Sequence, residues 1–267
     1  MAAWAEVGDR VFARRYDALD QEIGAIVGSD EIVVVDTRSH GPHARELQDD
    51  LRSLKRLPWR RVVNTHGHWD HCFGNALFRP AEIWAHDGCA GFLRRTGEAQ
   101  RRSAGGQLRG FDEAFAEVVI DPPDRTFTRS TVLDLGDRLV VLSHLGRGHT
   151  DHDIIVEVPD AGVLFAGDLV EEGAPPWFGD SYPLDWPDTL TALMARAARV
   201  IVPGHGAVVG PAFVASQLDE LRLIADVSRQ GHAAGVDWHA LVDRVAYPKP
   251  YAGQAVARAY AQLDGAL

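Results

Sequence analysis

The densest group of metal-binding side chains in the sequence lies in the segment NTHGHWDHCFGNALF, residues 64–78. His66 and His68 are two positions apart, and alternate side chains of an extended segment point the same way, so both imidazoles can face one metal ion. Asp70 and His71 follow where an apolar run predicts the start of a helix, and this turn directs them beside the first pair. The spacing therefore predicts a metal ion at the histidine pair and a second ion next to it.

Three further candidate ligands each follow an apolar run of strand length. His149 follows RLVVLSHLGRG, Asp168 follows GVLFAG and His205 follows RVIVPG. Functional sites are often assembled where strand ends meet at one edge of a sheet, because the strands are rigid and the loops can vary. Imidazole and carboxylate are ligands that zinc favours. In the predicted arrangement, one ion is bound by His66, His68 and His149, the other by Asp70, His71 and His205, and Asp168 bridges both.

Such a metal pair indicates hydrolytic chemistry. Two dications a few ångströms apart lower the pKa of a shared water, which gives a hydroxide nucleophile at neutral pH, and they also polarise a carbonyl or phosphoryl oxygen. Asp70 is the candidate catalytic residue, since a carboxylate beside the ions can orient the nucleophile or handle its proton. We expect two Zn²⁺ ions per chain, with iron or manganese as alternatives.

The elements that must position these ligands alternate between β-rich and helical segments. This order favours an α/β fold in which two packed sheets carry helices on the outside, a four-layer αββα sandwich, over a doubly wound parallel sheet. The predicted elements are, in order, a meander of strands within 10–37, a helix over 41–57, a strand over 60–65, strands within 131–168, a helix over 187–198, a strand over 199–204 and a helical tail from 211.

One segment interrupts this order. Residues 88–130 are predicted to be an insertion within one domain that spans residues 1–267, because Gly-Gly and Pro-Pro punctuate the segment. The simplest interpretation of its arginine-rich part is a solvated helical face. The arginines concerned are Arg94, Arg95, Arg101, Arg102 and Arg109.

A second segment, residues 171–187, directly follows Asp168 and is rich in Pro and Gly. We call it the aromatic loop. It either walls a mostly apolar substrate pocket or packs large aromatic side chains beneath itself, and the sequence leaves both interpretations open. Its aromatic residues are Trp177, Phe178, Tyr182 and Trp186.

Composition narrows the class of partner. With 38 acidic and 27 basic residues the net charge is −11, which is the wrong sign for binding a phosphate backbone, so we expect no nucleic acid partner. No apolar run approaches the roughly 20 residues that span a bilayer, and no export signal is recognised, so we expect a cytoplasmic protein without membrane contact. Cys72 and Cys89 are expected to be buried thiols rather than a disulfide. The expected partner is a small-molecule substrate, and the sequence does not determine the oligomeric state.

The run His66-Gly-His68-Trp-Asp70-His71 resembles the His-x-His-x-Asp-His signature of the metallo-β-lactamase fold superfamily. The later segments GRGHT, FAGD and PGHG are similar to the third-histidine, bridging-aspartate and last-histidine motifs of that family, and they occur in the family's order. The resemblance extends from about residue 7 to residue 210. It implies an αββα sandwich with the metal site at one edge.

The resemblance also distinguishes between candidate ligands. In HTDHD the family pattern favours His149 over His152 as the ligand. Asp168 stands where the cysteine-ligand β-lactamases have a thiolate, so the ligand set looks more like those of glyoxalase II and the lactonases. Ligating imidazoles usually donate their second N–H to a neighbouring acceptor. Candidates for such supporting roles are Thr65, Asp36 and His144.

These observations favour a binuclear zinc-dependent hydrolase that cleaves an ester, lactone, thioester or amide-like bond of a small molecule through a metal-bound hydroxide. The alternative is a mononuclear non-haem iron persulfide dioxygenase on the same fold. A binding module without activity is a third interpretation, which the complete ligand set disfavours. Substrate identity depends on residues 88–130, the aromatic loop and the tail, where the sequence shows no pattern that we recognise.

Overall fold

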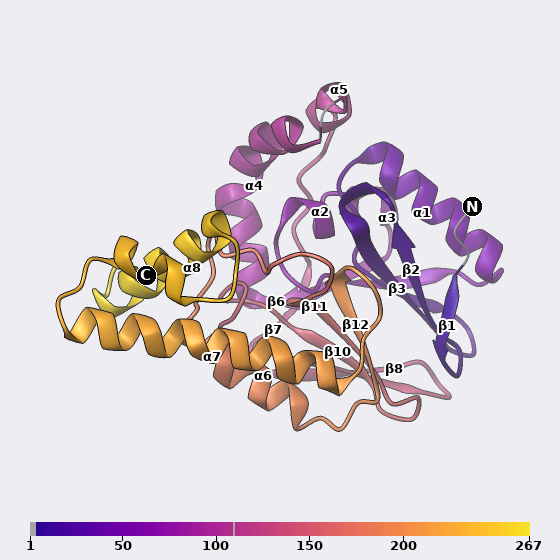
Figure 1. The fold of residues 1–267 in the computed structure, drawn as a ribbon. Helices are drawn as coiled ribbons and strands as arrows, with labels where there is room; N and C mark the ends of the chain where they lie inside the picture. Colours follow the sequence, from indigo (N-terminus) through magenta and orange to yellow (C-terminus); the bar gives the residue numbers. More distant parts are fainter. Residues whose placement is uncertain (1–3, 109) are drawn as a thin grey trace.

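The strands form one hydrogen-bonded path that folds into two halves (Figure 1). The computed structural model describes residues 4–108 and 110–267. In strand order the path runs β7-β6-β5-β4-β3-β12-β11-β10-β9-β8, and β2 pairs with both β1 and β3. The first half contains β1 (Ala5–Gly8), β2 (Val11–Tyr16), β3 (Gln21–Val27), β4 (Ile32–Val35), β5 (Trp59–Val63), β6 (Glu82–His86) and β7 (Arg125–Phe127). The second half contains β8 (Ser130–Asp134), β9 (Leu139–Ser143), β10 (Ile155–Val158), β11 (Val163–Glu171) and β12 (Val200–His205).

The two halves pack face to face, as alternation of apolar residues along each strand requires. Ile26 and Val33 of the first half share one buried cluster with Val156 and Phe165 of the second. At Gly24 a β-carbon would collide with the ring of Phe165, so only glycine lets the two sheets approach this closely here. The halves are joined between β3 and β12 by the residue pair Gln21 and His205.

Helices cover the two outer faces. On β3, Ile23 and its alternate neighbours point away from the sandwich and pack on Leu47 and Leu51 of α1. On the other half, Leu164 packs on Trp186 of α6 and on α7. The predicted four-layer αββα sandwich is therefore confirmed. The helices are α1 (Gly41–Leu54), α2 (Trp69–Cys72), α3 (Asn75–Phe78), α4 (Asp87–Gln107), α5 (Asp112–Ala116), α6 (Trp186–Met194), α7 (Pro211–Ala233) and α8 (Lys249–Leu263), with 3₁₀ turns η1 (Ala18–Asp20) and η2 (Trp238–Arg244).

Residues 88–130 contribute to the sandwich as well as to its surface. They hold nearly all of α4, together with α5 and β7, and β7 pairs in parallel with β6. One side of α4 buries Cys89 and Leu93 against Trp69 of α2, whereas its arginines are exposed or half-buried. The solvated helical face predicted from the arginines is thus one side of a helix whose opposite side packs on the ligand-bearing segment. Arg109 lies outside the described residues.

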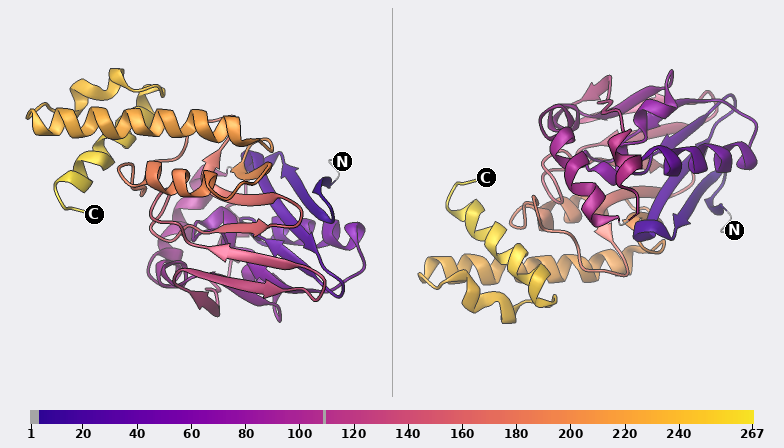
Figure 2. Two further views of the ribbon diagram at one scale, coloured as in Figure 1. Left: turned by 90° about the horizontal axis from the view of Figure 1, so that it is seen from below. Right: turned by 90° about the horizontal axis from the view of Figure 1, so that it is seen from above.

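The tail from residue 211 is helical, as predicted, and the arm that it forms projects to one side of the sandwich (Figure 2). Leu218 and Leu221 of α7 pack against the second half of the sheet, and Val256 of α8 belongs to the same cluster. The helices of the described part of the chain include none that is both long enough and apolar enough to cross a membrane.

Candidate metal centre

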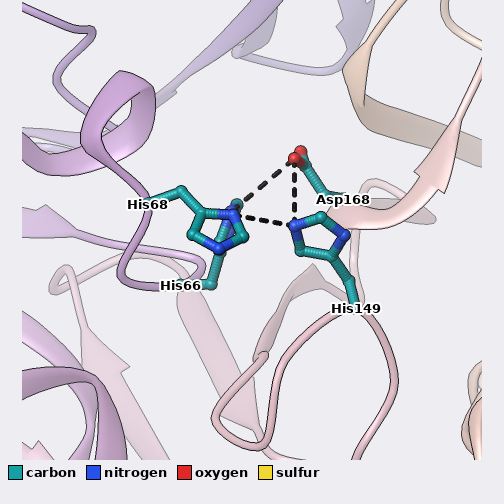
Figure 3. A group of neighbouring side chains, drawn as sticks. All are labelled: His66, His68, His149 and Asp168. Carbon is teal, nitrogen blue, oxygen red and sulfur yellow. Dashed lines mark hydrogen bonds and ion pairs between the residues drawn. The ribbon is translucent and has the colours of Figure 1, made fainter. Parts of the chain in front are cut away.

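The seven predicted ligands converge at one edge of the sandwich. His66, His68, His149 and Asp168 form one group, whose potential ligand atoms all lie within 4.8 Å of one another (Figure 3). A second group with the same property is formed by Asp70, His71 and His205. The six residues other than Asp168 divide as the sequence analysis divided them between two ions, and Asp168, which was predicted to bridge the ions, belongs to the first group.

Local chain geometry produces this convergence. β5 ends at Val63, and the chain then turns through the histidine segment into α2, which is only four residues long. Asp70 and His71 therefore sit in its single turn and point beside the first pair. Asp168 lies on β11 after Gly167, whose φ of 53° favours glycine, and a β-carbon there would approach the Thr65 side chain to 2.7 Å.

Asp168 lies between the two groups. Its Oδ2 is 3.6 Å from His66 Nε2 and 3.5 Å from His205 Nε2, and its Oδ1 is 3.2 Å from His71 Nε2. The side chain is buried, and its Oδ1 has no hydrogen-bond donor in the described part of the chain. Leaving a buried carboxylate oxygen without a partner is costly, so this atom fits a position that binds a cation.

Hydrogen bonds fix the protonation of the rings in the second group. His71 Nδ1 lies 2.9 Å from Asp36 Oδ2, and His205 Nδ1 lies 2.8 Å from the carbonyl oxygen of Leu19. A carboxylate and a carbonyl only accept, so in each neutral ring Nδ1 carries the proton and Nε2 carries a lone pair. The two Nε2 atoms face each other at 3.2 Å. Two lone pairs at this distance repel unless a proton or a metal ion lies against them.

The same reasoning applies to His66. Thr65 Oγ1 donates to Asp36 Oδ2 at 2.8 Å, so this hydroxyl is left to accept from His66 Nδ1–H at 3.1 Å. His66 Nε2 therefore carries its lone pair toward the site. The two predicted supporting residues, Asp36 and Thr65, lie beneath both ligand groups, because Asp36 also accepts from His71. The third candidate, His144, bonds the carbonyl oxygen of Asp153 and stacks on His86 instead.

His68 is oriented by a residue that sequence reasoning missed. His68 Nε2 donates to Oδ2 of Asp180, on the aromatic loop, at 3.1 Å, so His68 Nδ1 presents its lone pair to the site. This atom lies 3.1 Å from His66 Nε2 and 2.9 Å from His149 Nε2. Three ring nitrogens thus converge on one point, as a metal ion with histidine ligands requires. Nothing in the spacing of Asp180 from the motifs predicts its role.

Electrostatics at this edge also favour a cation. Burial lowers the pKa of His71 and His205, but the facing carboxylates, Asp168 first, outweigh it and raise both well above the usual value. Burial likewise lowers the pKa of His68, yet Asp180 and its acidic neighbours raise it to about 9. Carboxylate charge is therefore arranged to stabilise positive charge among the rings, whether protons or metal ions supply it.

His152 does not point into either group. Its Nε2 accepts from the backbone N–H of Gly67 at 3.1 Å, and its Nδ1 faces Asp151 at 2.6 Å. This leaves His149 as the histidine of HTDHD that lies in the first group. Cys72 and Cys89 are buried free thiols, and the Cys72 Sγ–H donates to the carbonyl oxygen of His68 rather than facing the site.

A cavity of about 500 Å³ opens above the ligand groups. The aromatic loop supplies one wall, where Trp177 is 45% exposed and lines the cavity. Phe178 and Trp186 of the same loop are fully buried in the core of the second half. Trp177 thus lines a cavity, as the first interpretation of this loop requires, whereas Phe178 and Trp186 pack beneath the loop, as the second requires. The opposite wall is formed by α4 and α8 and includes Phe92, Gln100, Ser103 and Tyr251.

Comparison with known proteins agrees with this geometry. The model of the metallo-beta-lactamase superfamily matches residues 17–205, which include all seven ligand positions. The chain belongs to the metallo-beta-lactamase superfamily. It is a metal-dependent hydrolase of that family, as its relatives are.

Individual relatives are distant. The "Metallo-beta-lactamase type 2" of Bacillus cereus is 24% identical over 196 residues, which cover 72% of this chain and 69% of that protein. The human "Acyl-coenzyme A thioesterase MBLAC2" is 28% identical over 235 residues, covering 76% of this chain and 80% of the relative.

Solved structures share the fold over most of the chain. A metallo-beta-lactamase from Pontibacter korlensis has a TM-score of 0.68 at 20% identity and covers 83% of this chain and 99% of its own. The sec-alkylsulfatase Pisa1 from a Pseudomonas species has a TM-score of 0.77 at 16% identity and covers 98% of this chain and 50% of its own. The alignment with Pisa1 thus reaches into the helical tail, beyond the residues that match the family model.

Proposed function

We propose that this protein is a binuclear zinc hydrolase that cleaves an ester, lactone, thioester or amide-like bond of a small molecule. The observation that carries the proposal is the close approach of three potential ligand atoms: Nε2 of His71 and Nε2 of His205 lie 3.2 Å apart, and Asp168 Oδ1 lies 3.2 Å from the His71 nitrogen. This arrangement is costly for a protein without a bound cation and favourable for one with two.

In this proposal the distances between the ligand atoms assign them to two zinc ions. His66, His68 and His149 bind one zinc ion and Asp70, His71 and His205 the other, while Asp168 reaches both. When bound, a zinc pair lowers the pKa of a water held between the ions and polarises a substrate carbonyl. Nitrogen and oxygen donors without a thiolate suit zinc, and they also suit iron and manganese.

Asp70 is the proposed catalytic residue. Its Oδ2 lies 3.2 Å from His205 Nε2 and 3.5 Å from His71 Nε2, and the side chain faces the cavity. A carboxylate at this position can accept a hydrogen bond from the attacking water and hold its proton until the leaving group takes it. Asp36 lies below the site and keeps His71 in the required tautomer, so it acts by positioning and not by contact with substrate.

Metal removal tests the proposal. We expect about two zinc ions per chain by elemental analysis, loss of esterase and lactonase activity on chelation, and recovery on adding zinc. The Asp168→Ala variant should lose at least about a hundredfold in kcat/KM, because the remaining donors lose the carboxylate that reaches both ions. Full activity of the metal-free protein, or of Asp168→Ala, would contradict the mechanism.

Elemental analysis also distinguishes the proposed hydrolase from the alternative, an iron dioxygenase. A mononuclear iron dioxygenase would contain close to one iron per chain as isolated and would consume oxygen when given glutathione persulfide. The His71→Ala variant separates the two cases further, since it removes a donor of the second group only. We expect this variant to retain about one zinc ion per chain and to lose hydrolysis.

A further inference from the structure

The cavity above the metal centre is lined by many acidic side chains. Four carboxylate side chains line it in addition to Asp70 and Asp168, and no lysine or arginine lines it in the described part of the chain. These carboxylates belong to Asp20, Glu171, Glu172 and Asp180. An anionic group entering the outer part of this space would leave water without meeting a lysine or arginine side chain.

Two of the four carboxylates have partners at the edge of the cavity. Asp20 bonds Arg15, whose guanidinium lies outside the cavity lining, and Asp180 bonds His68. Glu172 is half-buried, and in the described part of the chain its side chain accepts one hydrogen bond, from the backbone N–H of Ala207 at 2.7 Å. Arg15 interacts with its charge from outside the cavity lining. Glu171 is buried and accepts from the backbone N–H of Trp177 at 2.9 Å, and burial raises its pKa to about 8, so it adds little negative charge at neutral pH. After these contacts are counted, the lining keeps the carboxylate of Glu172 and contains no lysine or arginine in the described part of the chain.

Aromatic side chains complete the wall. Trp69, Phe92, Trp177 and Tyr251 all line the cavity, and Trp177 lies in the aromatic loop beside the acidic residues. The faces of aromatic rings attract cations, and rings combined with carboxylates recognise alkylammonium groups in particular. The proposed zinc ions lie at the base of the cavity, so their charge acts at the bond to be cleaved rather than on the remote part of the substrate.

We infer that the substrate carries no negative charge on the part remote from the scissile bond, that this part is apolar, and that a positive charge there improves binding. The inference rests on the proposed hydrolytic function and adds a substrate class to it. Carboxylated lactams, glutathione thioesters and coenzyme A thioesters fall outside this class, because each brings anionic groups into the cavity. Esters, lactones or amides with an alkyl, aryl or alkylammonium group fall within it.

A matched set of esters tests this charge preference. The set consists of phenyl acetates that carry a para trimethylammoniomethyl, neopentyl or sulfonatomethyl group, in which the methylene separates the charge from the reacting oxygen. Each kcat/KM of the zinc-loaded protein is divided by the hydroxide-catalysed rate constant of the same ester. We expect the cationic ester to exceed the anionic one by at least about tenfold at low salt, with the neutral ester between them, and the ratio to shrink as salt screens the wall.

A charge added at the rim gives the reciprocal test. Ser103 is exposed on α4 at the cavity, and its hydroxyl donates to the backbone carbonyl three residues earlier. Ser103→Lys should lower the cationic-to-anionic ratio several-fold. The matched control is Ser53→Lys on α1, because Ser53 is also exposed and makes the same bond to its own helix, but does not line the cavity. This control should leave the ratio unchanged.

The outcomes separate this inference from the proposed function. Hydrolysis of the anionic ester as fast as the cationic one would overturn the charge preference and leave the hydrolase proposal standing. If the zinc-loaded protein hydrolyses none of the three, the hydrolase proposal fails for simple esters. Calorimetric binding of the matched acetanilides then decides the inference alone. Tighter binding of the cationic member supports it, and equal dissociation constants, or no binding by the cationic member, overturn it.

Discussion

At the scale of single residues, His68 differs from His66, His71 and His205 in the hydrogen-bond partner of its second ring nitrogen. His66, His71 and His205 bond through their second nitrogen to groups of the sheet and its adjoining turns, whereas His68 bonds Asp180 on the aromatic loop. The side chain of Asp180 is 39% exposed, so this support lies near solvent. The orientation of one proposed ligand therefore depends on a loop that also walls the cavity.

Replacing Asp180 should weaken metal binding. Asp180→Ala removes the acceptor that keeps the His68 proton on Nε2, and we expect a loss of about 10- to 100-fold in zinc affinity, as found for such supporting residues. Asp180→Asn keeps an acceptor without the charge and should lose less. Affinity is measured by competition with a chromophoric chelator. Asp185→Asn, in the same loop but paired with Arg147, is the control, and an equal effect in all three variants would refute the assignment.

The sequence predicted which side chains come together better than it predicted their supports. The seven candidate ligands could be selected because each follows a recognisable strand or opens a helix, and these positions lie at one edge of the sandwich. Asp36, Thr65 and His144 were candidate supports because ligating imidazoles need an acceptor for their second N–H; Asp36 and Thr65 make such contacts and His144 does not. Asp180 was not a candidate, because its contact with His68 spans 112 positions and depends on the path of an irregular loop. Local periodicity carries no information about such a contact.

At the scale of elements, β3 carries a carboxylate in an unfavourable environment. Glu22 is buried with 7% of its surface exposed, and its Oε2 has no hydrogen-bond partner in the described part of the chain. Burial, only partly opposed by Arg15, raises its pKa from 4.5 to about 7. Because the folded state holds this proton more tightly than the unfolded state, the associated stability is fully present below about pH 4.5 and is lost as the pH rises through about 7.

Glu22→Gln should remove this pH dependence. The unfolding free energy of the variant minus that of the original protein should increase by about 2 kcal/mol from pH 5 to pH 8, the size that a pKa shift of this kind implies. Urea unfolding of both proteins at the two pH values measures the effect. Comparing the two proteins at the same pH cancels the contributions of other titrating groups to the unfolding free energy. A free-energy difference that is the same at both pH values would show that Glu22 does not titrate in this range.

Prediction of the elements failed where pattern was short. The meander, the strands before the ligands and the helical tail were predicted from alternation and helical spacing. β1, β6 and β7 were not predicted, and β6 and β7 lie at or inside the edges of the segment that was interpreted from its arginines and glycines. The structure of residues 88–130 was predicted mainly from their arginines. These describe the exposed side of α4 but give no information about the side that packs on Trp69.

At the scale of the whole molecule, the distance between the two sheets depends on Gly24. Its hydrogen lies where a β-carbon would meet the ring of Phe165, which is 2% exposed and enclosed by the core. Gly24→Ala should destabilise the fold by about 1–3 kcal/mol, as overpacking of a core does. Gly106→Ala is the matched control, because its β-carbon would have no heavy atom within 4 Å and should stabilise α4 by about 0.5–1 kcal/mol. Denaturant unfolding distinguishes them, and a neutral Gly24→Ala would show that the sheets can separate freely.

The strand order also determines when the protein can mature. β12 is the last strand to be synthesised, yet it lies between β3 and β11 in the middle of the path. Chains emerge from the ribosome N-terminus first, so β11 keeps one edge open until residues 200–205 appear, and Gln21 of β3 lacks its partner His205 until then. His205 arrives on this closing strand. The group of candidate ligands formed by Asp70, His71 and His205 is therefore complete only after the last strand of the sandwich has been synthesised.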